Sequence, residues 1–202
     1  MPRRPLLTAA ATLSTLTLLT ACTGSPEAGR PNPTPTATTP TPTPTPASPS
    51  APTWTPEELA AITAAKARYA ITTAAIDRTF MNPSALDRPT LEKAGLSGEW
   101  IITIVDQART LVSNGLYMTG KVQIAKTSVV SVKLKQAQPE VILLNCLDSS
   151  KQVMRFKSNG KEVPSGPGAG KRRQVSSELR FAPGQGNQKL WFLISDKDKG
   201  PC

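Results

Sequence analysis

Apolar residues recur at spacings of three, four and seven along a segment that starts shortly after Trp54. Thr55-Pro56-Glu57-Glu58 is typical of a helix start, with Thr55 as the N-cap and Glu58 closing a capping box. Asn82-Pro83 is a stop signal, so the pattern predicts one long helix over residues 56–81. The apolar face of this helix is predicted to contain Leu59, Ile62, Tyr69, Ile76 and Phe80.

Two shorter helices are expected to follow. The first covers about residues 89–94 and ends at Gly95, and the second covers about residues 98–113 and ends at Asn114-Gly115. The β-branched run at residues 101–105 weighs against the second, because such side chains lose rotamer freedom in a helix.

From Leu116 onward the pattern changes to the alternation that is typical of strands. Residues 141–147 are more continuously apolar, as expected of a central strand, and Trp191 and Phe192 should point to opposite faces of their strand. The expected strands cover residues 122–124, 130–134, 141–147, 152–157, 175–181 and 190–195. Helices followed by an antiparallel meander predict an α+β domain, in which the helices pack on a sheet of four to five strands.

The chain begins with the three-part pattern of a secretory signal. Arg3 and Arg4 supply the positive part, and residues 6–19 form an apolar run that is too short for a comfortable membrane span. Leu19-Thr20-Ala21-Cys22 then resembles the lipobox of bacterial lipoproteins. This resemblance implies cleavage before Cys22, a diacylglycerol on its thiol with an N-acyl chain such as palmitate, and anchoring on the extracytoplasmic face of the cell membrane. An ordinary signal peptide and an uncleaved anchor helix are the alternatives.

Residues 22–52 are expected to form a disordered tether. Thr-Pro pairs repeat between Pro31 and Pro52 with almost no large apolar side chain, so the segment cannot bury enough surface to offset its ordering entropy. The sequence therefore divides into a signal peptide (residues 1–21), a lipidated tether (22–52) and one folded domain (53–202).

The folded domain carries the excess of positive charge. The formal net charge of the chain is +10. Cleavage before Cys22 would remove only two charged side chains, those of Arg3 and Arg4. A basic domain at a cell surface favours acidic partners, such as anionic lipid head groups, wall polymers or an acidic envelope protein. The residues expected to make these contacts surround a Gly/Pro-rich loop: Lys157, Lys161, Lys171, Arg172 and Arg173. This loop has no aromatic side chain to stack on a base, which argues against nucleic acid. A solvated loop without a partner is the alternative.

Cys146 and Cys202 remain as an even pair once Cys22 is assigned to lipid. In an oxidising compartment such a pair favours a disulfide, with two free thiols as the alternative. Two cysteines without any histidine cannot supply the usual zinc ligands, so we expect no metal site and no cofactor other than the lipid.

The order of elements resembles the nuclear transport factor 2-like, or cystatin-like, cone. The nearer likeness is to small actinobacterial lipoproteins of that superfamily, which join a lipobox and a Pro/Thr tether to a domain with Cys-x-Asp on a strand and a cysteine at the C-terminus. The corresponding residues are Cys146-Leu147-Asp148 and Gly200-Pro201-Cys202. The resemblance covers residues 54–202 and implies a cone-like domain, in which helices and a curved sheet enclose a pocket.

Enzymes with the cone architecture place an acidic residue or a His–Asp pair in this pocket to move a proton. The chain contains no histidine, so the candidate carboxylates are Asp77, Asp106 and Asp148. Their positions favour a plainer assignment, with Asp77 and Asp106 exposed on helices and Asp148 in a strand-end turn. We therefore expect a non-catalytic binding or interaction module of the cell envelope. A small-ligand carrier, or a pocket enzyme with a buried carboxylate, is the alternative.

Overall fold

Three α-helices precede two antiparallel sheets along the chain. The structure, a computed structural model, describes residues 53–166 and 172–202, and the expected signal peptide, Cys22, the tether and Lys171 lie outside the described residues. The helices are α1 (Pro56–Met81), α2 (Arg88–Ala94) and α3 (Gly98–Ser113), with short 3-10 turns η1 (Pro83–Ala85) and η2 (Gln185–Asn187). The strands are β1 (Leu116–Thr119), β2 (Gln123–Lys133), β3 (Glu140–Asp148), β4 (Val153–Phe156), β5 (Arg172–Pro183) and β6 (Lys189–Pro201).

The start of α1 is held by the predicted capping box. The backbone N–H of Glu58 donates to Thr55 Oγ1 at 3.3 Å, and the N–H of Thr55 donates to Glu58 Oε2 at 2.9 Å. Ile62 and Tyr69 are buried as predicted, but Leu59, in the first turn, is 50% exposed. The three predicted helices are confirmed, and α2 ends at Gly95 in the left-handed conformation that glycine adopts most readily.

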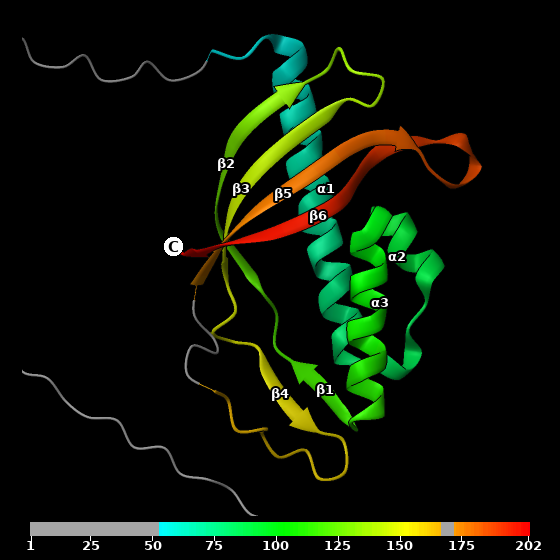
Figure 1. Cartoon of the computed structure of the whole chain (residues 1–202), viewed down its shortest axis with the longest axis vertical. Coiled ribbons are helices and arrows are strands. Elements are labelled where there is room, and N and C mark those ends of the chain that lie inside the picture. Colours follow the sequence, from blue (N-terminus) through cyan, green and yellow to red (C-terminus); the bar gives the residue numbers. More distant parts are fainter. Residues whose placement is uncertain (1–52, 167–171) are drawn as a thin grey trace, which may run out of the picture. The chain divides into compact units, whose positions relative to one another are not determined.

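The main sheet has the strand order β2-β3-β5-β6, and every neighbouring pair is antiparallel (Figure 1). The α+β class predicted from the sequence is confirmed. Residues 122–124 and 130–134 do not form two strands, because β2 runs continuously across them with two register shifts. The segment expected as a further strand of the sheet, β4, pairs instead with β1 in a separate two-stranded ribbon.

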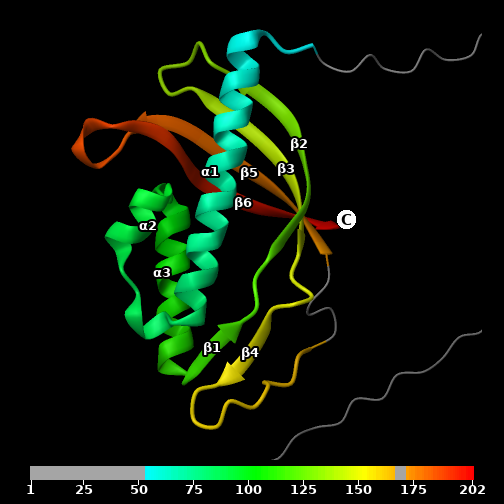
Figure 2. The same ribbon diagram turned by 180° about the vertical axis from the view of Figure 1, so that it is seen from behind.

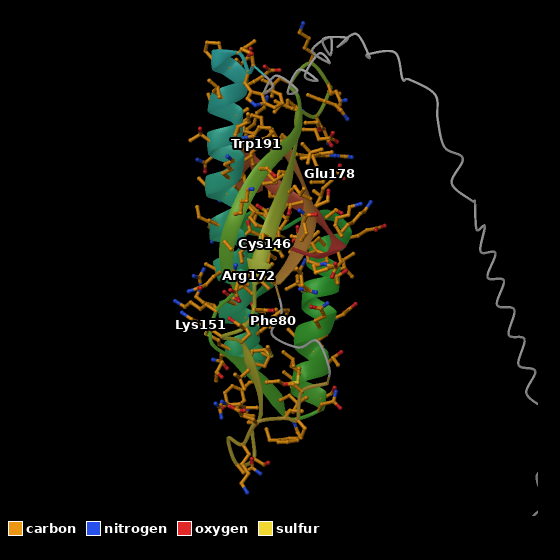
Figure 3. The ribbon with its side chains drawn as sticks, turned by 90° about the vertical axis from the view of Figure 1, so that its left-hand side faces the viewer. Phe80, Cys146, Lys151, Arg172, Glu178 and Trp191 are labelled. Carbon is orange, nitrogen blue, oxygen red and sulfur yellow. A yellow bond between two sulfur atoms is a disulfide. The ribbon has the colours of Figure 1, made fainter. Side chains whose placement is uncertain are left out.

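One face of the main sheet packs against α1, which crosses it in Figures 1 and 2. Alternate residues of β3 point to this face, and Val141 and Leu143 are completely buried there. Of the adjacent residues Trp191 and Phe192, one was expected to point away from the core. Trp191 joins the core, but Phe192 is also buried, because the turn around Gly184 lies against its ring. In Figure 3, Trp191 lies in the upper half of the domain and Phe80 in the lower half.

Cys146 and Cys202 form a disulfide, the pairing that the cysteine count predicts. Cys146 lies on β3 and Cys202 directly follows β6, yet β5 separates these two strands in the sheet. The bond therefore passes over the beginning of β5, beside Gln174, and ties two non-neighbouring parts of the sheet together.

Candidate functional site

A cavity of about 750 Å³ lies between α1, α3 and the ends of several strands. Its apolar lining includes Ile76, Phe80, Trp100, Ile104, Met118 and Met154. Asp106, Gln107 and Thr110 also line it and are exposed, so the cavity opens to solvent along α3. Small-molecule sites are typically of this size, roughly 300–1,000 Å³, and are mostly apolar.

Asp196 lines this cavity from β6, and the protein holds both of its carboxylate oxygens in place. The Tyr69 hydroxyl donates to Oδ2 at 3.1 Å, and the Ser177 hydroxyl donates to Oδ1. Tyr69 is itself 1% exposed and belongs to the core, so the carboxylate sits where the packed part of the domain meets the cavity.

A row of polar side chains leads to Asp196 across the sheet, half-buried at Thr127 and completely buried at Asn145 and Ser177. Thr127 Oγ1 donates to Asn145 Oδ1 at 2.6 Å, and Asn145 Nδ2 donates to Ser177 Oγ at 2.8 Å. With the hydrogen bonds to Asp196, this polar ladder (Thr127, Asn145, Ser177, Asp196 and Tyr69) takes one residue from each strand of the main sheet and one from α1. Because Asn145 and Ser177 are completely buried, an incomplete ladder would be costly, and this one is connected throughout.

Asp77 is a second carboxylate in the cavity wall. It is 4% exposed, although its place on the helical pattern predicted an exposed residue. The backbone N–H of Val122 donates to Oδ2 at 3.2 Å, and Gln152 Nε2 donates to Oδ1 at 2.9 Å. These partners follow β1 and precede β4, so the small ribbon brings to α1 the donors that make burial of this carboxylate tolerable.

Burial raises the pKa of two carboxylates in the cavity wall, Asp196 and Asp77. Loss of water raises the pKa of Asp196 to about 6, against the lowering effect of hydrogen bonds from Ser177 and Tyr69. Burial also raises the pKa of Asp77, while the hydrogen bond from Val122, the charge of Lys121 and the hydrogen bond from Gln152 oppose it. The pKa of Tyr69 lies above its ordinary range because of burial and the negative charge of Asp196.

The three carboxylates proposed from the sequence occupy different environments. Asp77 is buried in the cavity wall, and Asp106 stands at the opening, where it accepts a hydrogen bond from Arg109 at 3.3 Å. Asp148 lies elsewhere, and hydrogen bonds from Ser150 and Arg172 lower its pKa to about 2. It is therefore a structural carboxylate at the end of β3, as its predicted strand-end position indicates.

Asp196 escaped prediction because a β-bulge changes the direction in which it points. Leu193 pairs with Leu179 and Ser195 pairs with Glu178, so Ile194 is an extra residue in β6. Simple alternation from Trp191 and Leu193 would turn Asp196 to the outer face. After the bulge, it pairs with the inward-facing Ser177 instead.

The described members of the predicted basic contact region are divided among several environments. Lys157 and Lys161 flank the turn after β4, where Lys157 Nζ donates to Ser84 Oγ at 3.1 Å. Arg172 pairs with Asp148 at 2.9 Å, and Arg173 pairs with Asp198 at 3.5 Å while also lining the cavity. A contact role for these residues and for Lys171 stays a prediction.

Two kinds of feature are absent from residues 53–166 and 172–202. Within these ranges, no helix combines the length and the apolar character needed to cross a bilayer. The same ranges contain no group of three or more potential metal-ligating side chains.

The raised pKa of Asp196 predicts that stability falls as the pH rises from about 4 to about 6. The folded protein keeps this proton up to about pH 6, whereas the unfolded chain releases it near pH 4. The unfolding free energy should therefore drop by on the order of 1–3 kcal/mol across this window. Urea unfolding at pH 4, 5, 6 and 7 should show a smaller drop for Asp196→Asn. Asp148→Asn serves as the control and should keep the full drop, and an unchanged drop in Asp196→Asn would contradict the prediction.

Comparisons with known proteins give only distant structural similarity. The chain matches no protein-family model and no curated protein. Among solved structures, it is similar to the intermembrane space region of the chloroplast protein ARC6, with 12% identity over 67% of this chain and 94% of the other, and a TM-score of 0.45. It is also similar to a de novo designed β-sheet protein, with 15% identity over 69% of this chain and 91% of the other, and a TM-score of 0.30. At these scores neither similarity supports a statement about function.

Proposed function

We propose that this protein is a lipoprotein of the bacterial cell envelope whose folded domain binds a small organic molecule in the cavity between α1, α3 and the sheet. The observation that carries the proposal is a cavity of about 750 Å³ whose largely apolar lining includes Asp77 and Asp196, each of which has both carboxylate oxygens held by protein hydrogen bonds. Ligand sites combine apolar walls with a few oriented polar groups in this way. The Cys22 lipid and the tether would hold the site outside the membrane, where the basic charge of the domain adds attraction to anionic head groups.

Binding accounts for the carboxylates better than nucleophilic catalysis does. The sequence contains no histidine to activate a serine or cysteine. One observation favours a second function, proton transfer to a bound molecule: the pKa of Asp196, about 6, lies near neutral pH, where a general base works best. Chemical conversion of a bound molecule that is lost in Asp196→Asn would identify this second function.

A substitution that fills the cavity with a large side chain tests whether the cavity binds a small molecule. Thr103 lines the cavity, whereas the next residue, Ile102, does not and is 52% exposed. Thr103→Trp should occupy the ligand space, and Ile102→Trp should add the same side chain on the solvent side of α3. Native mass spectrometry of the full chain, purified from its own membrane, should show a non-covalent small-molecule adduct on the wild type and on Ile102→Trp, but not on Thr103→Trp.

The proposal fails on either of two results. One is a wild-type protein that carries no small molecule, and the other is an equal adduct on both tryptophan variants. Thermal unfolding of the two variants, followed by circular dichroism, would show that each is folded before the adducts are compared.

A further inference from the structure

The hydrogen bonds around Asp196 determine what the cavity still offers to a ligand. A serine or tyrosine hydroxyl has one proton, and both Ser177 and Tyr69 donate theirs to Asp196. Further along the polar ladder, Asn145 donates to Ser177. Each carboxylate oxygen has acceptor capacity for a second bond, so this end of the cavity presents acceptors. A ligand group placed beside Asp196 must therefore donate.

The charged side chains in the cavity wall differ in whether they have an ion-pair partner. Asp106 pairs with Arg109, and Arg173 pairs with Asp198. Among residues 53–166 and 172–202, neither Asp77 nor Asp196 forms a contact ion pair. The positive charges that act on them, Lys121 and Arg78 on Asp77 and Arg173 on Asp196, lie beyond ion-pair distance. An ionised carboxylate that leaves water without a positive partner costs free energy, which a cationic ligand would recover.

Aromatic and thioether side chains complete the wall. Phe80 from α1 and Trp100 from α3 both line the cavity, and the faces of such rings attract cations. Met118 and Met154 come from the two strands of the small ribbon, and the flexible methionine side chain adapts to apolar groups of different shape. The wall therefore suits a molecule with a positive donor group and an apolar body.

Resting on the proposed function, we infer that the ligand is an organic cation, with an ammonium group beside Asp196 or Asp77 and an apolar body against the aromatic and methionine side chains. The positive net charge of the chain, +10, does not prevent a cation from binding in the cavity. At physiological ionic strength, charges are screened beyond about 8 Å, so the nearest carboxylates dominate. Arg173 is the cation near Asp196, and its guanidinium is paired with Asp198. Lys121 and Arg78 are the cations near Asp77, and neither forms an ion pair with it.

Three probes that differ only at one end test the ligand class. They are 4-phenylbutylamine, 4-phenylbutanol and 4-phenylbutyrate, which share an apolar body and are respectively cationic, neutral and anionic at pH 7.5. Isothermal titration of the full chain in phosphatidylcholine nanodiscs, with empty nanodiscs as the blank, should give the amine a dissociation constant about 10-fold or more below that of the alcohol. The carboxylate should bind most weakly.

Variants assign the selectivity to the cavity carboxylates. At least one of Asp196→Asn and Asp77→Asn should weaken binding of the amine by about 10-fold, and both should leave binding of the alcohol nearly unchanged. Asp148→Asn removes a carboxylate that does not line the cavity and should behave as the wild type. The probe series on the wild type needs no variant, so the inference can be refuted even if a substitution prevents folding.

The outcomes separate the ligand class from the proposed function. If the alcohol or the carboxylate binds as well as the amine, and Thr103→Trp abolishes that binding, the inference of a cationic ligand is refuted. The proposal that the cavity binds a small molecule is then still supported. If none of the three probes binds, and no adduct is found on the protein from its own membrane, both are refuted. Selectivity for the amine that survives in Asp196→Asn and Asp77→Asn also overturns the inference.

Discussion

Replacing Cys22 with alanine should abolish the mature, membrane-held form of the protein. The lipobox resemblance of Leu19-Thr20-Ala21-Cys22 makes the Cys22 thiol the attachment point of the diacylglycerol, and alanine has no thiol to alkylate. Cell fractions from cultures grown with labelled palmitate should show label in the wild type and none in Cys22→Ala. Intact-mass analysis should show the mature species, which begins at residue 22, only in the wild type.

Thr23→Ala is the matched control for this experiment, because it changes the next residue and leaves the thiol in place. It should keep both the label and the membrane fraction. If Cys22→Ala were still processed and retained on membranes as the wild type is, the lipoprotein part of the proposed function would be wrong. The proposed ligand site would be unaffected, since it depends on residues of the folded domain.

Removal of the disulfide should cost about 4 kcal/mol of unfolding free energy. Cys146 and Cys202 are 56 residues apart, and the loop-entropy relation gives this value for a closed loop of that length. Domains of this size have total stabilities of roughly 5–15 kcal/mol, so the loss is a large fraction. Urea unfolding of Cys146→Ser/Cys202→Ser should show it. Hydrogen exchange should increase near residues 198–201 and much less near the buried residues 191–193 of β6.

Reduced wild-type protein is the control for the disulfide prediction. It should unfold at nearly the same urea concentration as the double variant, because both lack the same bond. Equal stability of the oxidised and reduced wild-type proteins would contradict the prediction. So would an intact mass that does not increase by two hydrogens on reduction, since that result would mean that two thiols are already free.

Local signals made the helices predictable. The capping residues of α1, and the stop signals at Asn82-Pro83, Gly95 and Asn114-Gly115, act over a few residues and are legible in one sequence. The same reasoning located β4 but not its partner, because strand pairing is decided by tertiary packing and a strand of four residues carries little pattern of its own.

The candidate site was only partly predictable, and both important carboxylates show why. Asp77 was named as a candidate, but its burial depends on donors from Val122 and Gln152, which are distant in the sequence. Asp196 precedes the charged run Lys197-Asp198-Lys199 and so has the pattern of a solvated strand end. The bulge at Ile194, which turns it inward, leaves no distinctive pattern in the sequence.

The polar ladder also restricts which alternative strand alignments the chain can adopt. A shift of one residue along β3 or β5 would send Asn145 or Ser177 to the outer face, because strand side chains alternate in direction. Their former partners would then be left in the interior without hydrogen bonds, at a cost of about 1–3 kcal/mol for each unsatisfied group. A shift of two residues would keep both side chains on the inner face but would break the same hydrogen bonds, whereas an apolar row would tolerate that shift far better. The buried row that ends at the cavity thus also discriminates against misaligned sheets during folding.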